Sequence, residues 1–368
     1  MSIWEEKWIE DIEYLKDSLI RNHANLFANI TKEEFNHNID RLKTMVNDLD
    51  YEEMKVEISK IVASVRDAHT AVIFPAKRYI PLKFYWFEDG IYIINTTERY
   101  KDLLFKKVIA IENIEIEKVM DELSEVISYE NQYLFKAQSM KYLQIAEALY
   151  GLMIIDEVDR IKITLEDDEF SVETVGVSEL TYMEINLPIY AENPFENYWH
   201  RYLENSHELY IKYNSCRESG KITIKQKIEE SIRFIETNKI HKVTIDLRNN
   251  LGGDSRLISP LIEYLKSNST INTKSNLKVI IGRETFSSAL LNAYELKFQT
   301  NGRILGEPSG GKPNCYGEIL KFTLPNSKLT VSYSTKYYKL IEDDDVMALY
   351  PDELILESIE DYLKVNRL

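Results

Sequence analysis

Two short segments place glycine, serine and polar residues where they could stabilise negative charge or supply a nucleophile. The first, Asp246-Leu-Arg-Asn-Asn-Leu-Gly-Gly-Asp-Ser255, follows an apolar stretch and precedes a helical pattern. Gly252 and Gly253 can adopt positive φ and present backbone N–H groups, and such groups at a helix start are natural oxyanion donors. Glycine is equally expected in a tight turn between a strand and a helix. This segment alone therefore favours neither interpretation.

Ser287 lies in the second segment, Gly282-Arg-Glu-Thr-Phe-Ser-Ser-Ala-Leu-Leu291, which also connects an apolar stretch to a helical pattern. A hydroxyl at this point can act as a nucleophile, because the helix dipole and the N–H of Ser288 favour developing negative charge. Thr285, Ser287 and Ser288 are also good helix N-caps. Taken alone, the segment is better interpreted as a helix cap.

The sequence offers one candidate for a general base and separate candidates for the acidic residue that would orient it. His69, in Arg66-Asp-Ala-His-Thr70, ends an N-terminal helical region. A histidine at such a boundary can be a general base, although a single histidine usually has a structural role. The acidic run Glu342-Asp-Asp-Asp345 is typical of a solvated loop, and one of its carboxylates could orient a catalytic histidine.

The segment Gly306-Glu-Pro-Ser-Gly-Gly-Lys-Pro313 nearly matches the phosphate-binding pattern G-x-x-x-x-G-K-[ST]. Its last position is proline, which has no hydroxyl for magnesium and no N–H for a phosphate. We therefore interpret this near-match as coincidental.

Composition limits the class of protein. The chain has 368 residues, of which 44% are hydrophobic and 29% charged, and this length suggests two to three domains of about 150 residues. A net charge of −16 argues against nucleic acid and anionic membrane surfaces as partners. No apolar stretch approaches the ~18 residues of a membrane span, and no signal peptide is recognisable, so we expect a cytoplasmic protein. Two cysteines and six scattered histidines indicate no disulfide framework and no metal or cofactor site.

The pattern of elements changes along the chain. Residues 3–66 have helical spacing, residues 72–176 indicate short strands around a helix, and the chain from residue 180 alternates strands with helices, which implies a largely parallel sheet. The predicted strands are 80–87, 91–95, 107–111, 160–165, 209–213, 243–247 and 277–281, and the predicted helices include 129–152, 224–237, 257–265, 288–298 and 353–365.

Together these segments resemble the S41 family of serine peptidases, which comprises the tail-specific or C-terminal processing peptidases and tricorn-like relatives. The resemblance spans nearly the whole chain. Its landmarks occur in the family's order: Asp67-Ala-His-Thr70, Tyr210-Ile-Lys-Tyr-Asn-Ser-Cys216, the Asp246–Ser255 segment as the most specific signature, the Ser287 segment, and then Gly306-Glu307 with Pro351-Asp352.

The resemblance implies a fold and a domain organisation. It predicts an α/β protein with a ClpP/crotonase-like catalytic core at 177–368, an N-terminal helical region at 1–75, and an inserted, degenerate PDZ-like α+β domain at 76–176. Lys106-Lys107 stands where a PDZ domain usually carries glycine, so peptide-end binding by this domain stays open.

The resemblance also implies a serine-type endopeptidase or C-terminal processing peptidase that acts on polypeptides, with Ser287 as nucleophile. The tricorn-like arrangement matches His69 as base and Asp345 as its acidic partner, and we favour it. The serine–lysine arrangement matches Lys312, 25 residues beyond the serine, but Tyr316 replaces its usual glutamine helper.

The N–H groups of Ser288 and of Gly252 or Gly253 would form the oxyanion hole. Two other classes remain: a catalytically inactive peptide- or ligand-binding protein on the same scaffold and, more distantly, a nucleotide-binding enzyme. The substrate, the cleavage position and the oligomeric state stay open.

Overall fold

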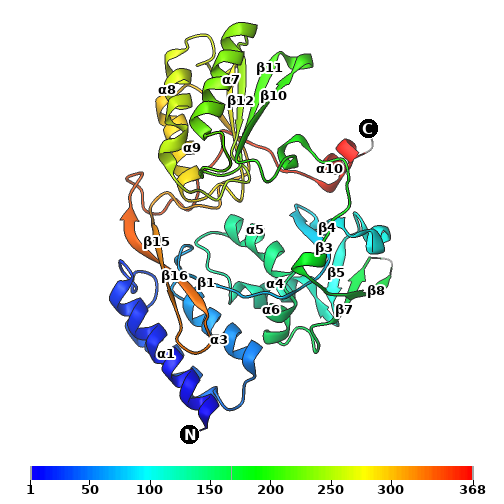
Figure 1. Cartoon of the computed structure of the whole chain (residues 1–368), viewed down its shortest axis with the longest axis vertical. Helices are drawn as coiled ribbons and strands as arrows, with labels where there is room; N and C mark the ends of the chain where they lie inside the picture. The colour runs from blue at the N-terminus through cyan, green and yellow to red at the C-terminus, as the bar shows by residue number, and fades with distance from the viewer. Residues whose placement is uncertain (1, 167, 367–368) are drawn as a thin grey trace. The chain divides into compact units, whose positions relative to one another are not determined.

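The structure, a computed structural model, describes residues 2–166 and 168–366 (Figure 1). The chain divides into two compact units. The first unit comprises Met1–Glu130, Phe135–Ile185 and Cys315–Tyr338, and the second comprises Asn131–Leu134, Asn186–Asn314 and Lys339–Leu368. No helix of the described ranges is both long and apolar enough to cross a bilayer.

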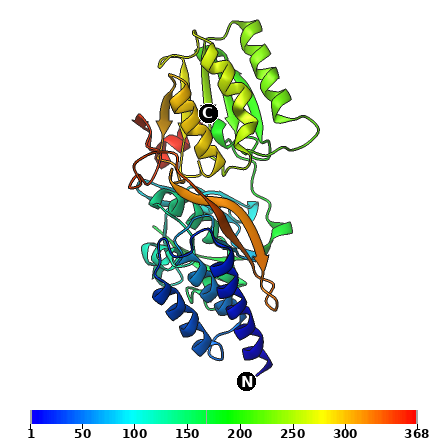
Figure 2. The same ribbon diagram turned by 90° about the vertical axis from the view of Figure 1, so that its left-hand side faces the viewer.

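The first unit begins with the predicted helical region. Three helices, α1 (Ile3–Asn22), α2 (Lys32–Met45) and α3 (Tyr51–Ala63), each begin at a side chain that accepts a hydrogen bond from a first-turn N–H. Their apolar faces share one core with a hairpin of β15 (Cys315–Thr323) and β16 (Thr330–Tyr338). The short strand β1 (Ala71–Ile73) pairs antiparallel with β16, and Figure 2 shows the hairpin running along these helices.

The rest of the first unit is a mixed α/β region, with strands at or near the predicted positions. β3 (Leu82–Phe87) and β4 (Gly90–Thr96) form a hairpin, and a four-stranded sheet has the order β6-β5-β7-β8. The predicted helix at 129–152 is two helices, because Ile145 instead adopts extended backbone and pairs with Tyr79. The bounds are β2 Arg78–Tyr79, β5 Val108–Ile111, β6 Ile114–Glu115, β7 Arg160–Leu165, β8 Glu169–Glu173, β9 Val175–Gly176, α4 Ile116–Ser124, α5 Gln132–Tyr142 and α6 Ala146–Gly151.

The second unit is built on a six-stranded sheet of order β10-β11-β12-β13-β14-β17. All neighbouring pairs from β11 to β17 are parallel, and β10 is an antiparallel edge strand. The strands are β10 Tyr198–Leu203, β11 Glu208–Tyr213, β12 Lys242–Asp246, β13 Leu277–Ile281, β14 Arg303–Gly306 and β17 Glu353–Leu354, and the helices are α7 Ile224–Asn238, α8 Ser259–Ser267, α9 Ser288–Gln299 and α10 Ile359–Asn366. The predicted α/β class is confirmed.

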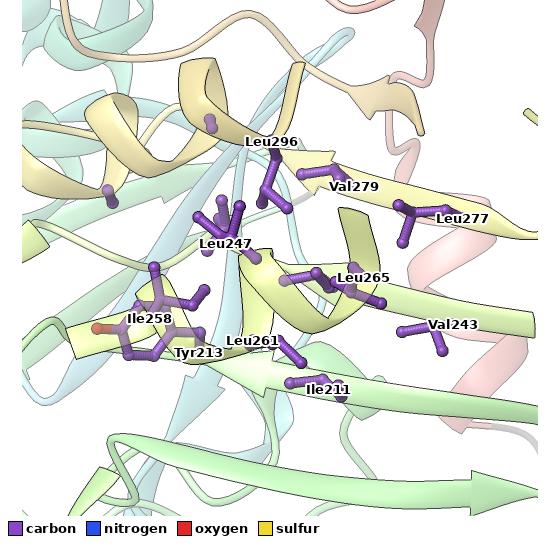
Figure 3. Packing of buried hydrophobic residues seen from close by; sticks show 14 of the residues in the cluster. Ile211, Tyr213, Val243, Leu247, Ile258, Leu261, Leu265, Leu277, Val279 and Leu296 are labelled. Atoms are coloured by element: carbon purple, nitrogen blue, oxygen red, sulfur yellow. The ribbon is translucent and has the colours of Figure 1, made fainter. Parts of the chain in front are cut away.

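Apolar side chains from this sheet and its helices form one core, as parallel strands buried on both faces require. Figure 3 shows side chains of β11, β12 and β13 meeting those of α8 and α9, among them Ile211, Val243, Val279, Leu265 and Leu296. The core fixes the carboxyl ends of β12 and β13. The loops that carry the candidate glycine and serine residues follow these two strands.

Two segments differ from the sequence-based expectation. The helix predicted at 353–365 begins only at Ile359, because residues 353–354 add a parallel strand to β14 instead. The hairpin at 315–338 falls within the predicted 177–368 segment, yet it packs with the first unit, since β16 pairs with β1. Both differences come from pairings between segments distant in sequence. The division into 1–75, 76–176 and 177–368 stays a prediction.

Candidate active site

The glycine loop, residues 247–254, follows β12 and runs beside the segment after β11. The N–H of Cys216 donates to Gly252 O at 3.1 Å, and the N–H of Asp254 donates to Cys216 O at 2.6 Å. Gly253 has φ +138°, and a Cβ there would lie 2.1 Å from Cys216 O. Glycine is therefore required at position 253 by both backbone conformation and close packing.

The two glycines differ in what their N–H groups do. The N–H of Gly252 donates to Asn250 Oδ1 at 2.9 Å, while Gly253 O accepts from Ser288 Oγ at 2.6 Å. Within the described parts of the chain, the N–H groups of Gly253 and Ser288 donate to no other residue. Of the two predicted glycine donors, Gly253 is thus the better placed to bind an oxyanion.

The serine loop, residues 282–287, joins β13 to α9. Ser287 occupies the N-cap position of α9 with φ +53° and ψ −128°, and its side chain makes no capping hydrogen bond. The capping interpretation, which the local sequence favoured, is therefore wrong for Ser287. A non-glycine residue with this backbone is strained, and a strained serine in a strand-to-helix turn is the geometry of a nucleophile elbow.

Thr285 and Asn250 hold the two loops in place, and neither was singled out for this role by its sequence. Both are fully buried. Thr285 Oγ1 accepts from Gly282 N–H at 2.9 Å and donates to Leu247 O at 2.9 Å. Asn250 Nδ2 donates to Tyr213 O at 3.0 Å. The one available signal was that both residues lie within three positions of the predicted functional residues.

Gly252 packs directly against the serine loop, which gives a testable consequence. An added Cβ would lie 2.8 Å from both Ser287 Cβ and Ser288 N. We expect Gly252→Ala to lower kcat/KM at least about 100-fold, because it displaces the candidate nucleophile Ser287 and the candidate oxyanion donor Ser288 together. Hydrolysis of an unstructured protein substrate measures this loss.

Gly220→Ala is the matched control for Gly252→Ala. Gly220 also has positive φ, +73°, but nothing lies within 4 Å of an added Cβ. It therefore carries the backbone strain, about 1 kcal/mol, without the steric conflict. Equal activity losses in the two variants would contradict the assigned role of Gly252.

The loop 306–313 packs onto the serine loop and does not form a phosphate cradle. The N–H of Gly311 donates to Thr285 O at 3.1 Å, and the N–H of Ser309 donates to Leu349 O at 3.1 Å. A Cβ at Gly310 would lie 2.0 Å from Arg283 O. The N–H groups of Ser309 and Gly311 thus donate to backbone carbonyls within the protein. This agrees with the interpretation of the phosphate-binding near-match as coincidental.

Lys312 and Asp345 belong to the same unit as Ser287. Lys312 is half-buried within the 306–313 loop. Asp345 is exposed in the loop before β17, and its N–H donates to Asp343 Oδ1 at 2.9 Å. Among the described residues, no hydrogen bond or ion pair joins either side chain to Ser287. The structure therefore brings together Ser287, Ser288, Gly252 and Gly253, whereas Lys312 and Asp345 make no direct contact of this kind.

His69 lies in the first unit, where Asp67 organises its backbone. Asp67 Oδ1 accepts from His69 N–H at 3.0 Å, and Oδ2 accepts from Thr70 Oγ1 at 2.5 Å. Ser332 Oγ donates to His69 O at 2.9 Å. The segment around His69 is thus fixed to β16.

His23 is a further partner of this segment, and no motif in the sequence pointed to it. Its Nε2 lies 2.9 Å from Asp67 Oδ2, and both side chains are buried. Its Nδ1 accepts from Asn25 N–H at 3.1 Å, so Nε2 must carry the proton and donate to Asp67. Since both ring nitrogens of His23 are engaged, His69 stays the candidate base.

The imidazole of His69 is buried, with 5% of the residue exposed. Burial lowers its pKa below the ordinary value, while the Asp67 carboxylate and a hydrogen bond to the Tyr316 backbone act in the opposite direction. Histidine that stays neutral near pH 7 is in the form needed to accept a proton.

No family model matches the chain, and no curated protein matches it in sequence. Solved structures do match. Mature CPAF complexed with lactacystin has a TM-score of 0.70 at 11% identity, covering 99% of this chain and 96% of that chain. A putative peptidase from Parabacteroides merdae ATCC 43184 has a TM-score of 0.51 at 13% identity, covering 98% and 93%.

The chain has the CPAF fold. A second structure of mature CPAF gives the same result, with a TM-score of 0.69. The likeness to CPAF agrees with the α/β architecture that the sequence motifs predicted. At 11% identity, the likeness concerns the fold, and the roles of individual residues rest on the geometry described above.

Proposed function

We propose that this chain is a serine peptidase of the S41 type, which hydrolyses polypeptides through an acyl-enzyme on Ser287. The observation that carries the proposal is the backbone of Ser287, at φ +53° and ψ −128°, with a side chain that does not cap its helix. Such strain persists where the surroundings impose it and is concentrated at functional sites. A structural neighbour described as a putative peptidase supports the same reaction class.

In the proposed mechanism, Ser287 Oγ attacks the peptide carbonyl while His69 accepts the serine proton. The tetrahedral oxyanion is stabilised by the N–H groups of Gly253 and Ser288, each contributing about 3 kcal/mol to lowering the barrier. His69 then protonates the leaving amine, which departs as the acyl-enzyme forms. Water, deprotonated by His69, hydrolyses the ester, and the proton returns to Ser287. Asp345 is proposed to hold the His69 tautomer.

Lys312 is the alternative base, in a serine–lysine arrangement. The neutral form of His69 that burial favours, together with the fixed segment around it, supports His69 over Lys312. The parallel sheet of the second unit is compatible with a ClpP/crotonase-like core, and the strands of 76–176 with a PDZ-like insert. C-terminal processing of substrates and a cytoplasmic location belong to the same proposal.

Covalent labelling tests the proposal directly. The full-length protein is incubated with a fluorophosphonate probe, digested and analysed by mass spectrometry. We expect one adduct, on the peptide that contains Ser287, and parallel cleavage of an unstructured protein substrate. An adduct elsewhere would contradict the nucleophile assignment, and absence of both labelling and cleavage would favour an inactive binding protein on this scaffold.

A further inference from the structure

A buried group of charged side chains at the carboxyl ends of β11 and β12 takes no part in the mechanism above. Lys212 and Asp246 have fully buried side chains, with Lys212 Nζ 3.1 Å from Asp246 Oδ1. Arg248 donates to Asp246 Oδ2 from Nε at 2.9 Å and from Nη2 at 2.6 Å. Tyr210 OH donates to the same oxygen at 2.7 Å. The backbone N–H of Arg248 donates to Asp246 Oδ1 at 2.9 Å, so both carboxylate oxygens have donors besides Lys212.

Stability alone does not explain why a lysine is buried at position 212. Burial alone would raise the pKa of Asp246, but Lys212 and Arg248 hold it well below its usual range. Burial lowers the pKa of Lys212, against the attraction of Asp246. The desolvation of a buried ion pair commonly offsets its attraction, and Arg248 already neutralises Asp246. The buried position of Lys212 is better explained by a second hydrogen bond that its ammonium group donates.

That second contact leads from the sheet to both loops of the site. Lys212 Nζ donates to Asn249 Oδ1 at 2.9 Å, and Asn249 lies in the glycine loop. Asn249 Nδ2 donates in turn to Glu284 Oε2 at 3.2 Å, and Glu284 lies in the serine loop. One chain of hydrogen bonds thus connects the buried cluster, the glycine loop and the serine loop.

We propose that Lys212 is a positioning residue, an inference that rests on the proposed function. Through Asn249 and Glu284, Lys212 holds the glycine loop against the serine loop. The Gly253 N–H and Ser287 lie on these two loops, so their separation depends on how firmly the loops are joined. Oxyanion donors act only within hydrogen-bonding distance of the developing charge, and small displacements remove much of their effect.

Lys212→Met and Asn249→Ala, singly and combined in the full-length chain, test this coupling. In Lys212→Met, Asp246 keeps Arg248 and Tyr210 as partners, and Asn249 is exposed, so both variants are expected to fold. Lys278→Met is the matched control, because Lys278 lies in the same sheet with a side chain 41% exposed and an ion pair to Glu208.

Two measurements are made on each variant. Hydrogen exchange reports loop coupling through the Phe286 N–H, which donates to Asn250 O across the loops at 3.1 Å. Peptidase assays and fluorophosphonate labelling report its catalytic consequence. We expect each single variant to raise exchange at 282–290 and to lower kcat by about 10-fold with little change in KM. The double variant should be no worse than either single variant, because both act through one chain of contacts.

Several outcomes would overturn the proposal: unchanged exchange in Asn249→Ala, additive losses in the double variant, or an equal loss in Lys278→Met. Glu284→Gln keeps an acceptor for Asn249 and should behave like the wild type, whereas Glu284→Ala should reproduce Asn249→Ala. Coupled exchange in a wild-type protein that neither cleaves nor labels would support the positioning role and overturn the proposed peptidase function.

Discussion

Ser287→Ala is expected to lower kcat/KM by about 10⁶-fold and to abolish fluorophosphonate labelling, because it removes the atom that forms the acyl-enzyme. The fold should be unaffected. Ser287 has no side-chain cap to lose, and alanine removes only the hydroxyl. Peptide hydrolysis and adduct formation measure the loss, and a thermal melt verifies that the variant is folded.

Ser288→Ala is the matched control for Ser287→Ala. It removes the bond from Ser288 Oγ to Gly253 O but keeps the backbone N–H assigned to the oxyanion hole. We therefore expect a loss of about 10-fold or less, the scale of one polar contact. If Ser288→Ala were the inactive variant and Ser287→Ala still labelled, the nucleophile would have been assigned to the wrong serine.

The second large effect concerns the base. We expect His69→Asn to lower kcat/KM by at least about 10⁴-fold, as loss of a triad member does, and Lys312→Met to change it by less than about 10-fold. Steady-state kinetics on both variants decide between the two arrangements. The opposite ranking would establish the serine–lysine arrangement and remove His69 from the mechanism.

The pH dependence gives the same assignment an independent test. The proposed mechanism requires neutral His69, and burial lowers the pKa of His69 below its ordinary value. We therefore expect kcat/KM to stay level through neutral pH. It should fall only as the pH drops below about 6.5, where the imidazole gains a proton. A fall in kcat/KM at acidic pH whose midpoint lay above neutral pH would contradict His69 as the base.

The sequence by itself determined the class of fold and the order of its candidate functional segments. The parallel sheet followed from alternating apolar strands and helices, since β12, β13 and α9 lie within one residue of their predicted bounds. The glycine and serine loops followed from glycine, asparagine and serine placed between a strand and a helix. Short-range patterns suffice here because each loop is flanked by its own strand and helix.

Tertiary structure decided what the local sequence left open. The local sequence favoured Ser287 as a helix cap, but its backbone is strained and its turn packs closely against Gly252, which is distant in sequence. The strand at 353–354 depends on pairing with β14, and the hairpin at 315–338 joins the first unit through pairing with β1. His23 and Lys212 act through Asp67 and Asn249, partners distant in sequence. Periodicity along the chain carries no information about such contacts, and only the folded backbone brings them together.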